Sequence, residues 1–152
     1  MNKWARYLNE NRLTAAGIIV IIDDDGLFLI IRRSDADKRS GEWTIPGGHI
    51  DEKDCTIEHG AIRELKEETN LNCEVCDLVY LGQPKPEKFY FYAKKWDGDV
   101  NVSIPNPETD EIEHDDYKWS TLEEVKDIDN TEIPIYLLEK ALEMSKNERN
   151  SS

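Results

Sequence analysis

The chain is poor in basic residues. It carries 19 Lys and Arg residues against 33 Asp and Glu residues, which gives a formal net charge of −14 at pH 7. Binding to a nucleic acid backbone without regard to sequence needs a basic footprint, so this composition argues against that partner. A small phosphate compound stays compatible with it, because bound cations can reverse the local field.

Long apolar runs are also missing. The longest stretch, residues 15–22, is too short to span a bilayer and is followed by the three aspartates at 23–25. The first six residues lack the apolar core of a signal peptide. We therefore expect a cytoplasmic protein with no membrane attachment.

Cysteines are few, and the three present are expected to be reduced, because no export signal is evident. Cys73 and Cys76 form a lone Cys-x-x-Cys in a segment that reads as a strand, where the two thiols would point to opposite faces. A redox pair needs a helix N-terminus, and a zinc site needs a second pair of ligands. We predict no function for this pair.

The length and the 38% hydrophobic content predict one domain over residues 1–152, with a frayed polar tail at residues 146–152. No internal repeat or linker is evident. Periodicity and turn residues predict strands at 14–22, 27–31, 73–81, 89–92 and 116–119, and helices at about 56–69, from 121, and from Pro134. Loops are expected at 32–42 and, longer, at 97–115. Strands, one helix, more strands and a final helix predict an α+β fold or an α-β-α sandwich.

Three carboxylates are expected to share one face of the central helix. Glu64, Glu67 and Glu68 stand at positions i, i+3 and i+4, shortly after the Pro-Gly-Gly turn at 46–48. Like charges at this spacing destabilise an isolated helix by roughly 0.2–0.5 kcal/mol per pair, and a hard divalent cation with oxygen ligands would offset that repulsion. Arg63 can hold a carboxylate or a phosphate in a bidentate fork. The alternative is a charged, solvated helix face.

These residues resemble the Nudix hydrolase family, whose box is written GX5EX7REUXEEXGU, with U aliphatic. Residues 41–48, GEWTIPGG, look like the approach to the box in many members. The positions that match the box itself are Gly48, Arg63, Glu64, Leu65, Glu67, Glu68 and Leu71.

The chain departs from the box in three linked places. The stretch from Gly48 to Arg63 is one residue longer than the pattern, and the first box glutamate is missing. Counting forward from Gly48 places that position on Asp54, and counting back from Arg63 places it on Cys55. The late glycine is Asn70, the next best residue for a left-handed helix C-cap.

The resemblance implies an α-β-α sandwich with a mixed sheet and hydrolysis of a nucleoside diphosphate linked to another group. It implies Mg²⁺ or Mn²⁺ as cofactor, because such an ion neutralises phosphate charge and activates a bound water. The implied metal ligands are Glu64, Glu67, Glu68 and the backbone carbonyl of Gly48. Arg63 is expected to orient a box glutamate, and the catalytic set is Glu67, Glu113 and Arg63.

The general base of such enzymes comes from the box or from a glutamate outside it. Here residues 111–119 carry a Glu-His-x-x-Tyr-x-Trp pattern similar to one that recurs in the family, and it favours Glu113 over Glu111 as base or extra ligand. The alternatives are a solvated acidic loop at 111–119 and a base inside the box. Among the histidines, His49 is expected at the rim of the site, His59 on the surface and His114 in a solvated loop, where it could orient Glu113.

The resemblance leaves the substrate open. A proline some fifteen residues after the box is associated with ADP-ribose hydrolysis, and Pro86 lies at that separation from Leu71. A tyrosine slightly further on is associated with dinucleoside polyphosphates, and Tyr90 lies just beyond that range. Alternatives are a nucleoside triphosphate pyrophosphohydrolase that removes damaged nucleotides, a GDP-mannose-type hydrolase, or a non-catalytic module that senses a nucleotide. The expected partner is a small nucleotide, and a homodimer is an option that the sequence leaves open.

Overall fold

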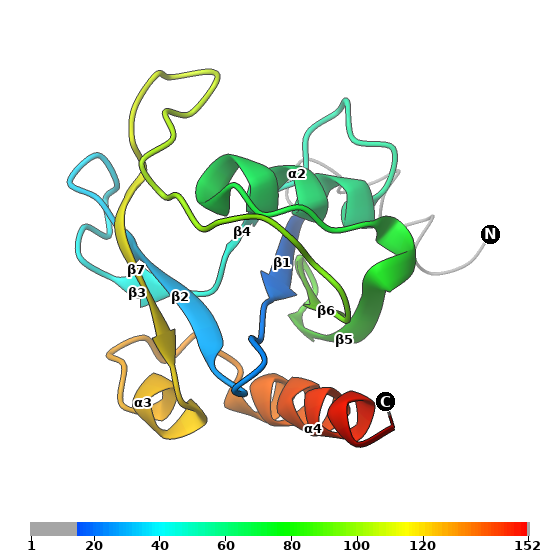
Figure 1. Cartoon of the computed structure of the whole chain (residues 1–152). Coiled ribbons are helices and arrows are strands. Elements are labelled where there is room, and N and C mark those ends of the chain that lie inside the picture. The colour runs from blue at the N-terminus through cyan, green and yellow to red at the C-terminus, as the bar shows by residue number, and fades with distance from the viewer. Residues whose placement is uncertain (1–14, 152) are drawn as a thin grey trace.

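The computed structural model describes residues 15–151, and a mixed four-stranded sheet forms its centre (Figure 1). The strand order is β4-β1-β6-β5. β1 (Ala16–Val20) runs parallel to β6 (Lys88–Ala93) and antiparallel to β4 (Gly47–His49). β5 (Leu78–Lys85) pairs antiparallel with β6. The predicted start of the first strand at Thr14 and the N-terminal hexapeptide lie outside the described residues.

A second, antiparallel sheet stands beside the first, in the order β3-β2-β7. It contains β2 (Phe28–Arg33), β3 (Trp43–Thr44) and β7 (His114–Ser120). The turn between β1 and β2 contains Gly26 at φ +80°, as expected for a hairpin-type turn. β7 begins two residues before the predicted strand, because His114 pairs with Arg33 after a register shift.

Helices cover both sides of the strands, which confirms the α-β-α sandwich with a mixed sheet. Figure 1 shows α2 (Ile57–Thr69) above the strands and α4 (Ile135–Ser151) below them. The short helix α3 (Leu122–Lys126) begins with the predicted capping box on Thr121. One apolar core lies between the strands and α2, around Ile19, Leu65 and Phe89, and a second lies on the side of α4, around Ile30 and Leu138.

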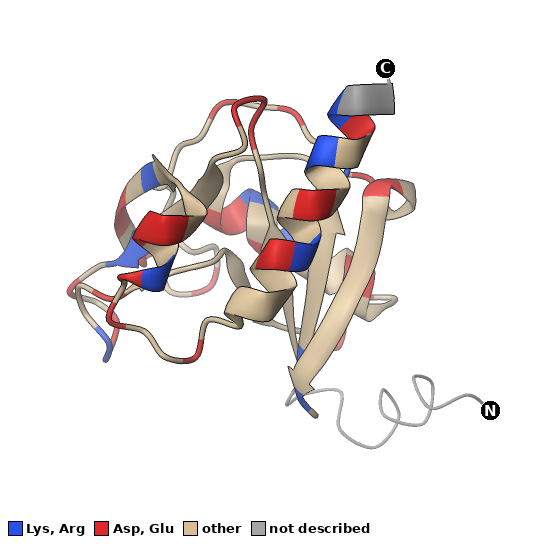
Figure 2. Cartoon of the chain, turned by 90° about the horizontal axis from the view of Figure 1, so that it is seen from below, with Lys and Arg blue, Asp and Glu red and all other residues tan. Residues whose placement is uncertain are grey.

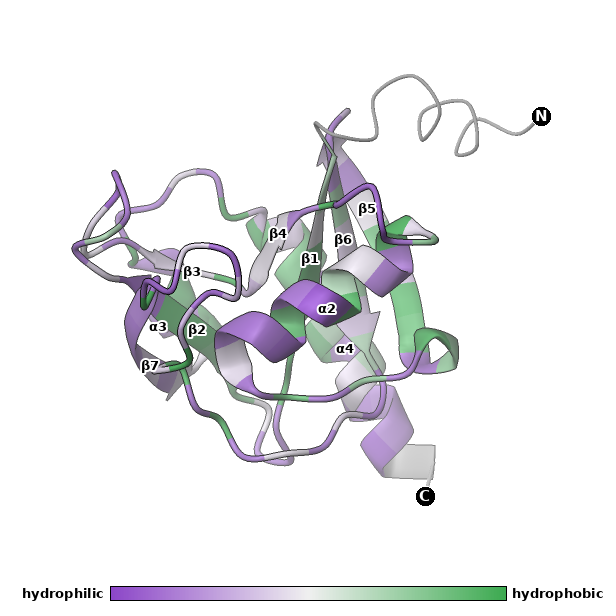
Figure 3. Cartoon of the chain, turned by 90° about the horizontal axis from the view of Figure 1, so that it is seen from above, coloured by the Kyte–Doolittle hydropathy of each residue, from purple (hydrophilic) through white to green (hydrophobic). Residues whose placement is uncertain are grey.

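Charge and hydropathy follow these layers. Figure 2 shows Asp and Glu spread over the helices and loops, while the strands carry few charges. In Figure 3 the side of α2 that is turned away from the sheet is mostly hydrophilic. Among residues 15–151, none of the helices has the length and apolar character needed to cross a membrane.

The helix α2 lies close to the sheet because small residues meet there. A Cβ atom on Gly17 of β1 would stand 2.8 Å from Cβ of Ala61. The helix begins at the N-cap Thr56, whose side chain accepts from the amide of His59, and ends at Asn70 in the left-handed region, at φ 69°. Asn70 therefore does take the C-cap conformation expected at that position.

Two local predictions are wrong. Residues 75–77 form a short 3₁₀ helix (η2) before β5, so Cys73 and Cys76 do not lie on a strand. β5 continues to Lys85, so the turn before β6 lies at residues 86–87 and not around residues 84–86, where the two prolines predict it. α4 extends to Ser151, into the segment for which fraying is expected.

Candidate active site

Arg63 connects the residues of the box. Its Nε and Nη2 atoms donate to the two carboxylate oxygens of Asp54, both at 3.0 Å. Its Nη1 atom donates to Glu64 at 3.2 Å and to Glu67 at 3.1 Å, and Nη2 also donates to the carbonyl of His49 at 3.1 Å. The hydrogen bonds with Asp54 are the main reason that the pKa of Arg63 is raised above its ordinary value. Arg63 thus donates to three carboxylates, those of Asp54, Glu64 and Glu67.

Two residues, Asp54 and Cys55, match the position of the missing first box glutamate, and of these Asp54 is the one that contacts Arg63. Its side chain is 6% exposed and accepts from Arg63 and from the backbone N–H of Asp51 at 2.7 Å. Cys55 is exposed. A Cβ on Gly60 would lie 2.8 Å from Asp54 Oδ2, so the carboxylate fits into a space that α2 leaves free. The shorter aspartate reaches Arg63 from a loop that is one residue longer.

Glu64 and Glu68 form a pair of carboxyl groups, in which Glu68 is buried and the side chain of Glu64 is 16% exposed. Burial raises the pKa of Glu64 to about 7, against the opposing effect of Arg63. Burial and the neighbouring Glu64, to which it is hydrogen-bonded, raise the pKa of Glu68 well above its ordinary value. The backbone N–H of Gly47 donates weakly to Glu68 Oε2, at 3.4 Å. Two carboxyls in this position favour either a shared proton or a bound cation.

The double glycine makes room for this pair. A Cβ on Gly48 would stand 2.5 Å from the carboxylate of Glu64, so a side chain at this position would displace the glutamate. The donor set around Gly48 consists of carboxylate and carbonyl oxygens, which are the ligands of hard divalent cations. The chemical nature of these oxygen ligands therefore suits a hard divalent cation.

Glu67 is turned to a different partner. Its Oε2 atom accepts from Arg63, and its side chain is 26% exposed. Across residues 15–151, no three acidic, His or Cys side chains are grouped so that they could hold a metal ion. The structure therefore brings Glu64 and Glu68 together beside Gly48, whereas Glu67 is connected to Glu64 through Arg63 Nη1. The roles given to all these residues stay predictions.

The loop before β7 approaches the pair from the second sheet. His114 is buried, with Nε2 3.9 Å from Glu68 Oε2, and burial lowers the pKa of His114 to about 4. The expectation of a solvated histidine is wrong, because pairing with Arg33 draws this residue into β7. Glu113 is half-buried and within electrostatic reach of Glu68, whereas Glu111 is exposed.

Two cavities flank the segment that contains Gly48. One, of about 350 Å³, lies over α2 and is lined by the exposed His49, by Arg63, Glu64 and Glu67, and by Asn106 and Glu108 of the long loop. The other, of about 290 Å³, lies on the opposite side of β4. Its charged and polar lining includes Arg33, Arg39, Lys88, Tyr90, Asn130 and Glu132. His49 lines both cavities, which places it at the rim as expected, and His59 is exposed, as expected.

Sequence reasoning missed the residues of the second cavity. Arg33, Arg39 and Lys88 are three cations in an acidic chain, but they come from β2, a loop and β6. The sequence signal was the basic Arg32-Arg33 and Arg39 around the loop of residues 32–42. Asn130 carried no such signal. Its amide donates to Glu42 and to the carbonyl of Trp43.

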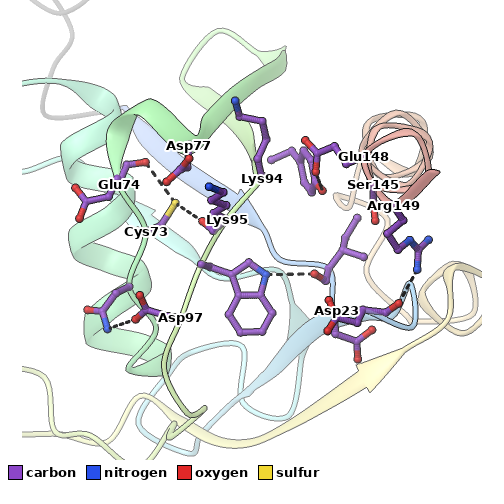
Figure 4. A pocket seen from close by; sticks show the side chains of 15 residues that line it. Asp23, Cys73, Glu74, Asp77, Lys94, Lys95, Asp97, Ser145, Glu148 and Arg149 are labelled. Carbon is purple, nitrogen blue, oxygen red and sulfur yellow. Dashed lines mark hydrogen bonds between the residues drawn. The ribbon is translucent and has the colours of Figure 1, made fainter. Parts of the chain in front are cut away.

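A larger cavity of about 690 Å³ lies elsewhere, between α4, the β1–β2 turn and the segments that follow α2 and β6 (Figure 4). Its walls mix acidic and basic side chains with Cys73 and Trp96, whose indole donates to the carbonyl of Ile22. Burial raises the pKa of the Cys73 thiol to about 11, which keeps it protonated at neutral pH. No residue of the box lines this cavity.

The sequence is similar to parts of known proteins. A MutT-like protein of Streptomyces ambofaciens is 43% identical over 60 residues, which are 40% of this chain and 36% of that protein. The matched segments span only 22% and 36% of the first two curated relatives.

Solved structures share the fold. An Ap4A hydrolase of Caenorhabditis elegans, in a binary complex, superimposes with a TM-score of 0.63 at 26% identity, over 87% of this chain and 98% of that one. The NUDIX domain of Shewanella oneidensis NrtR, complexed with ADP ribose, gives a TM-score of 0.59 at 21% identity, over 95% and 99%. The sequence itself matches the NUDIX domain family over residues 11–140, and the chain belongs to that family.

Proposed function

We propose that this chain is a Nudix pyrophosphohydrolase that cleaves the pyrophosphate bond of a nucleoside diphosphate linked to another group. The observation that carries the proposal is the pairing of Glu64 with the buried Glu68 beside Gly48, with Arg63 holding the neighbouring carboxylates. A buried carboxyl pair is unfavourable unless a proton or a cation compensates it. We expect a divalent cation to take that place in the active protein.

The proposed cofactor is Mg²⁺ or Mn²⁺. Glu64, Glu67, Glu68 and the carbonyl of Gly48 would hold it, and Glu67 would have to exchange its hydrogen bond with Arg63 for the metal. When bound, such an ion neutralises phosphate charge and lowers the pKa of a bound water. The requirement for a metal therefore follows from the charge of the site as well as from the family.

The remaining residues would hold the box carboxylates in position and accept a proton from the attacking water. Arg63 keeps the box carboxylates in position through its bonds to Asp54. Glu113, on the loop opposite α2, is the proposed general base, because a base must reach the attacking water from a side that the metal ligands leave open. Glu67 is the alternative base, since its side chain borders the cavity over α2.

The favoured substrates are ADP-ribose and dinucleoside polyphosphates. The cavity lined by Arg33, Arg39 and Lys88 lies next to Gly48, so it could receive the anionic remainder of a substrate whose pyrophosphate sits at the box. Tyr90 in the same wall offers an aromatic surface. The named neighbours include an Ap4A hydrolase and a domain complexed with ADP ribose.

Two other functions use the same site. The second candidate is a nucleoside triphosphate pyrophosphohydrolase, with a GDP-mannose-type hydrolase as another option, because the same metal site could serve a different substrate pocket. A non-catalytic nucleotide sensor is the candidate of another class. The presence of all three glutamates of the box favours catalysis over sensing. We further propose a single domain over residues 1–152, a cytoplasmic location and a homodimer.

The test is a screen of nucleotide substrates with Mg²⁺ or Mn²⁺, in which products are separated and released phosphate is measured after phosphatase treatment. We expect turnover that chelator abolishes and added metal restores. Glu67→Gln and Glu68→Gln should each lower kcat at least about a hundredfold, while Glu58→Gln, in the first turn of the same helix, should not. Binding without turnover would indicate a sensor, and full turnover in excess chelator would exclude the proposed site.

A further inference from the structure

The long loop before β7 carries a side-chain contact with the proposed base. Asn106 Nδ2 donates to Glu113 Oε1 at 2.8 Å, across seven residues of the loop. The main chain next to Glu113 is fixed from another side, because Ser34 N donates to the carbonyl of Glu113 at 2.8 Å and Ser34 Oγ to that of Ile112 at 2.5 Å. The backbone and the carboxylate of Glu113 are thus held by two different elements.

The orientation of the Asn106 amide is fixed by its other atom. Its Oδ1 accepts from the backbone N–H groups of Glu108 at 2.8 Å and Thr109 at 3.3 Å. Only the oxygen of an amide can accept these bonds, so the NH₂ group has to face Glu113. The turn is closed by backbone bonds from Asn106 to Glu111 and from Asp110 to Asn106, both 2.8 Å.

The same residue borders the site. Asn106 lines the cavity over α2 together with Arg63, Glu64 and Glu67. Glu113 lies within electrostatic reach of Glu68. The neutral amide of Asn106 holds the Glu113 carboxylate near the box helix without adding charge.

We propose that Asn106 is a positioning residue, which keeps the carboxylate of Glu113 beside the box helix in the orientation needed for proton transfer. The inference rests on the proposed hydrolase function with Glu113 as base. Without the amide donor, Glu113 would keep its backbone position through Ser34, but its side chain would turn towards solvent.

The isosteric change Asn106→Asp separates this role from folding of the loop. An aspartate keeps the oxygen that accepts from Glu108 and Thr109 but replaces the donor to Glu113 by a like charge. At saturating metal we expect kcat to fall about tenfold or more, because the lost bond is charge-assisted. KM and the melting temperature should stay nearly unchanged. The neutral variant Asn106→Ser should lower kcat similarly, which excludes an effect of added charge alone.

Asn101→Asp is the matched control. Asn101 Oδ1 accepts from the backbone N–H of Ser103 at 3.0 Å in the same long segment, and this bond does not involve Glu113. In the Glu113→Gln background, Asn106→Asp should add no further loss, because a glutamine amide can donate to the new carboxylate.

The results separate the inference from the function on which it rests. Wild-type turnover reports the function, and an inactive wild type would overturn both. With an active wild type, three results overturn the inference alone: unchanged kcat in Asn106→Asp, an equal loss in Asn101→Asp, or an additive loss in the Glu113→Gln background. Full activity of Glu113→Gln overturns it as well, since Asn106 would then position a residue that the reaction does not use.

Discussion

Arg63 and Asp54 face each other through two parallel hydrogen bonds, Nε to Oδ1 and Nη2 to Oδ2, both 3.0 Å long. Such a bidentate pair fixes the plane of the guanidinium. The Nη1 atom then donates to both Glu64 and Glu67. The orientation of the box carboxylates therefore depends on a residue outside the helix.

Asp54→Asn should weaken both the fold and the site. It removes the charge that pairs with Arg63, and we expect the free energy of unfolding to fall by about 2 kcal/mol, less than for a fully buried pair because Arg63 is 31% exposed. The kcat should fall with it, since Arg63 is no longer held. Cys55→Ser, at the other position that the pattern allowed, should change stability by less than about 0.5 kcal/mol. Urea unfolding and steady-state kinetics measure the two effects, and equal effects at 54 and 55 would contradict the assignment.

The order of the elements and the position of the box could be predicted from sequence. Alternation and capping residues are local signals, which is why the strands β1, β2 and β6 and the ends of α2 agree with expectation to within a few residues. Asn70 is a good example, because the left-handed C-cap depends on that residue alone.

The parts that could not be predicted depend on contacts between distant segments. His114 is buried because β7 pairs with β2, where its partner Arg33 lies 81 residues earlier in the chain. Lys88, Arg39 and Asn130 meet only after the sheets assemble. The choice between Asp54 and Cys55 needed the position of Arg63 in space. Helical spacing placed Glu64, Glu67 and Glu68 on one face, but it could not show that Arg63 Nη1 bridges Glu64 and Glu67.

Alanine at the two glycines of β4 should have different consequences. In Gly48→Ala the new Cβ meets the end of the flexible Glu64 side chain at 2.5 Å, so the carboxylate shifts and metal affinity should fall by about tenfold with little loss of stability. In Gly47→Ala it meets the backbone of β1, Gly17 O and Ile18 Cα, both at 2.7 Å. That contact should lower the free energy of unfolding by about 1–3 kcal/mol. Metal titration and thermal melting distinguish the two, and a loss of stability alone in both variants would show that Gly48 has no role in the site.

The metal-free protein should lose stability as the pH rises through the range in which Glu64 and Glu68 ionise. The folded protein holds protons on these carboxyls above the ordinary glutamate pKa of 4.5, up to about 7 for Glu64. The folded state binds more protons than the unfolded state in this range, so their stabilising effect is complete below pH 4.5 and declines as the pH rises to 7. In chelator, the melting temperature of Glu68→Gln relative to wild type should therefore increase over that range.

The comparison with Glu68→Gln removes the opposing effect of His114. Burial lowers the pKa of that histidine to about 4, so its contribution is lost as the pH falls, and it is present in both proteins. Saturating Mg²⁺ should reduce the difference, because the ion replaces the proton. A difference in melting temperature that does not change with pH would mean that Glu68 is ionised in the metal-free fold.

Lys85 and Lys88 both bind Glu132, and they allow a matched test of the cavity that lies next to Gly48. Lys85 and Lys88 both donate to Glu132 at 3.2 Å, Lys85 to Oε1 and Lys88 to Oε2, but only Lys88 lines the cavity next to Gly48. Lys88→Gln should raise KM about tenfold and leave kcat nearly unchanged, because a contact made equally in ground and transition states affects binding alone. Lys85→Gln breaks an equivalent ion pair with Glu132 and should leave KM within about twofold of wild type. The KM increase of Lys88→Gln should shrink at high salt, as expected for an anionic group bound in a partly exposed cavity. If the two variants raise KM equally, the effect comes from Glu132, and the substrate has to be placed over α2, where His49 and Asn106 form the wall.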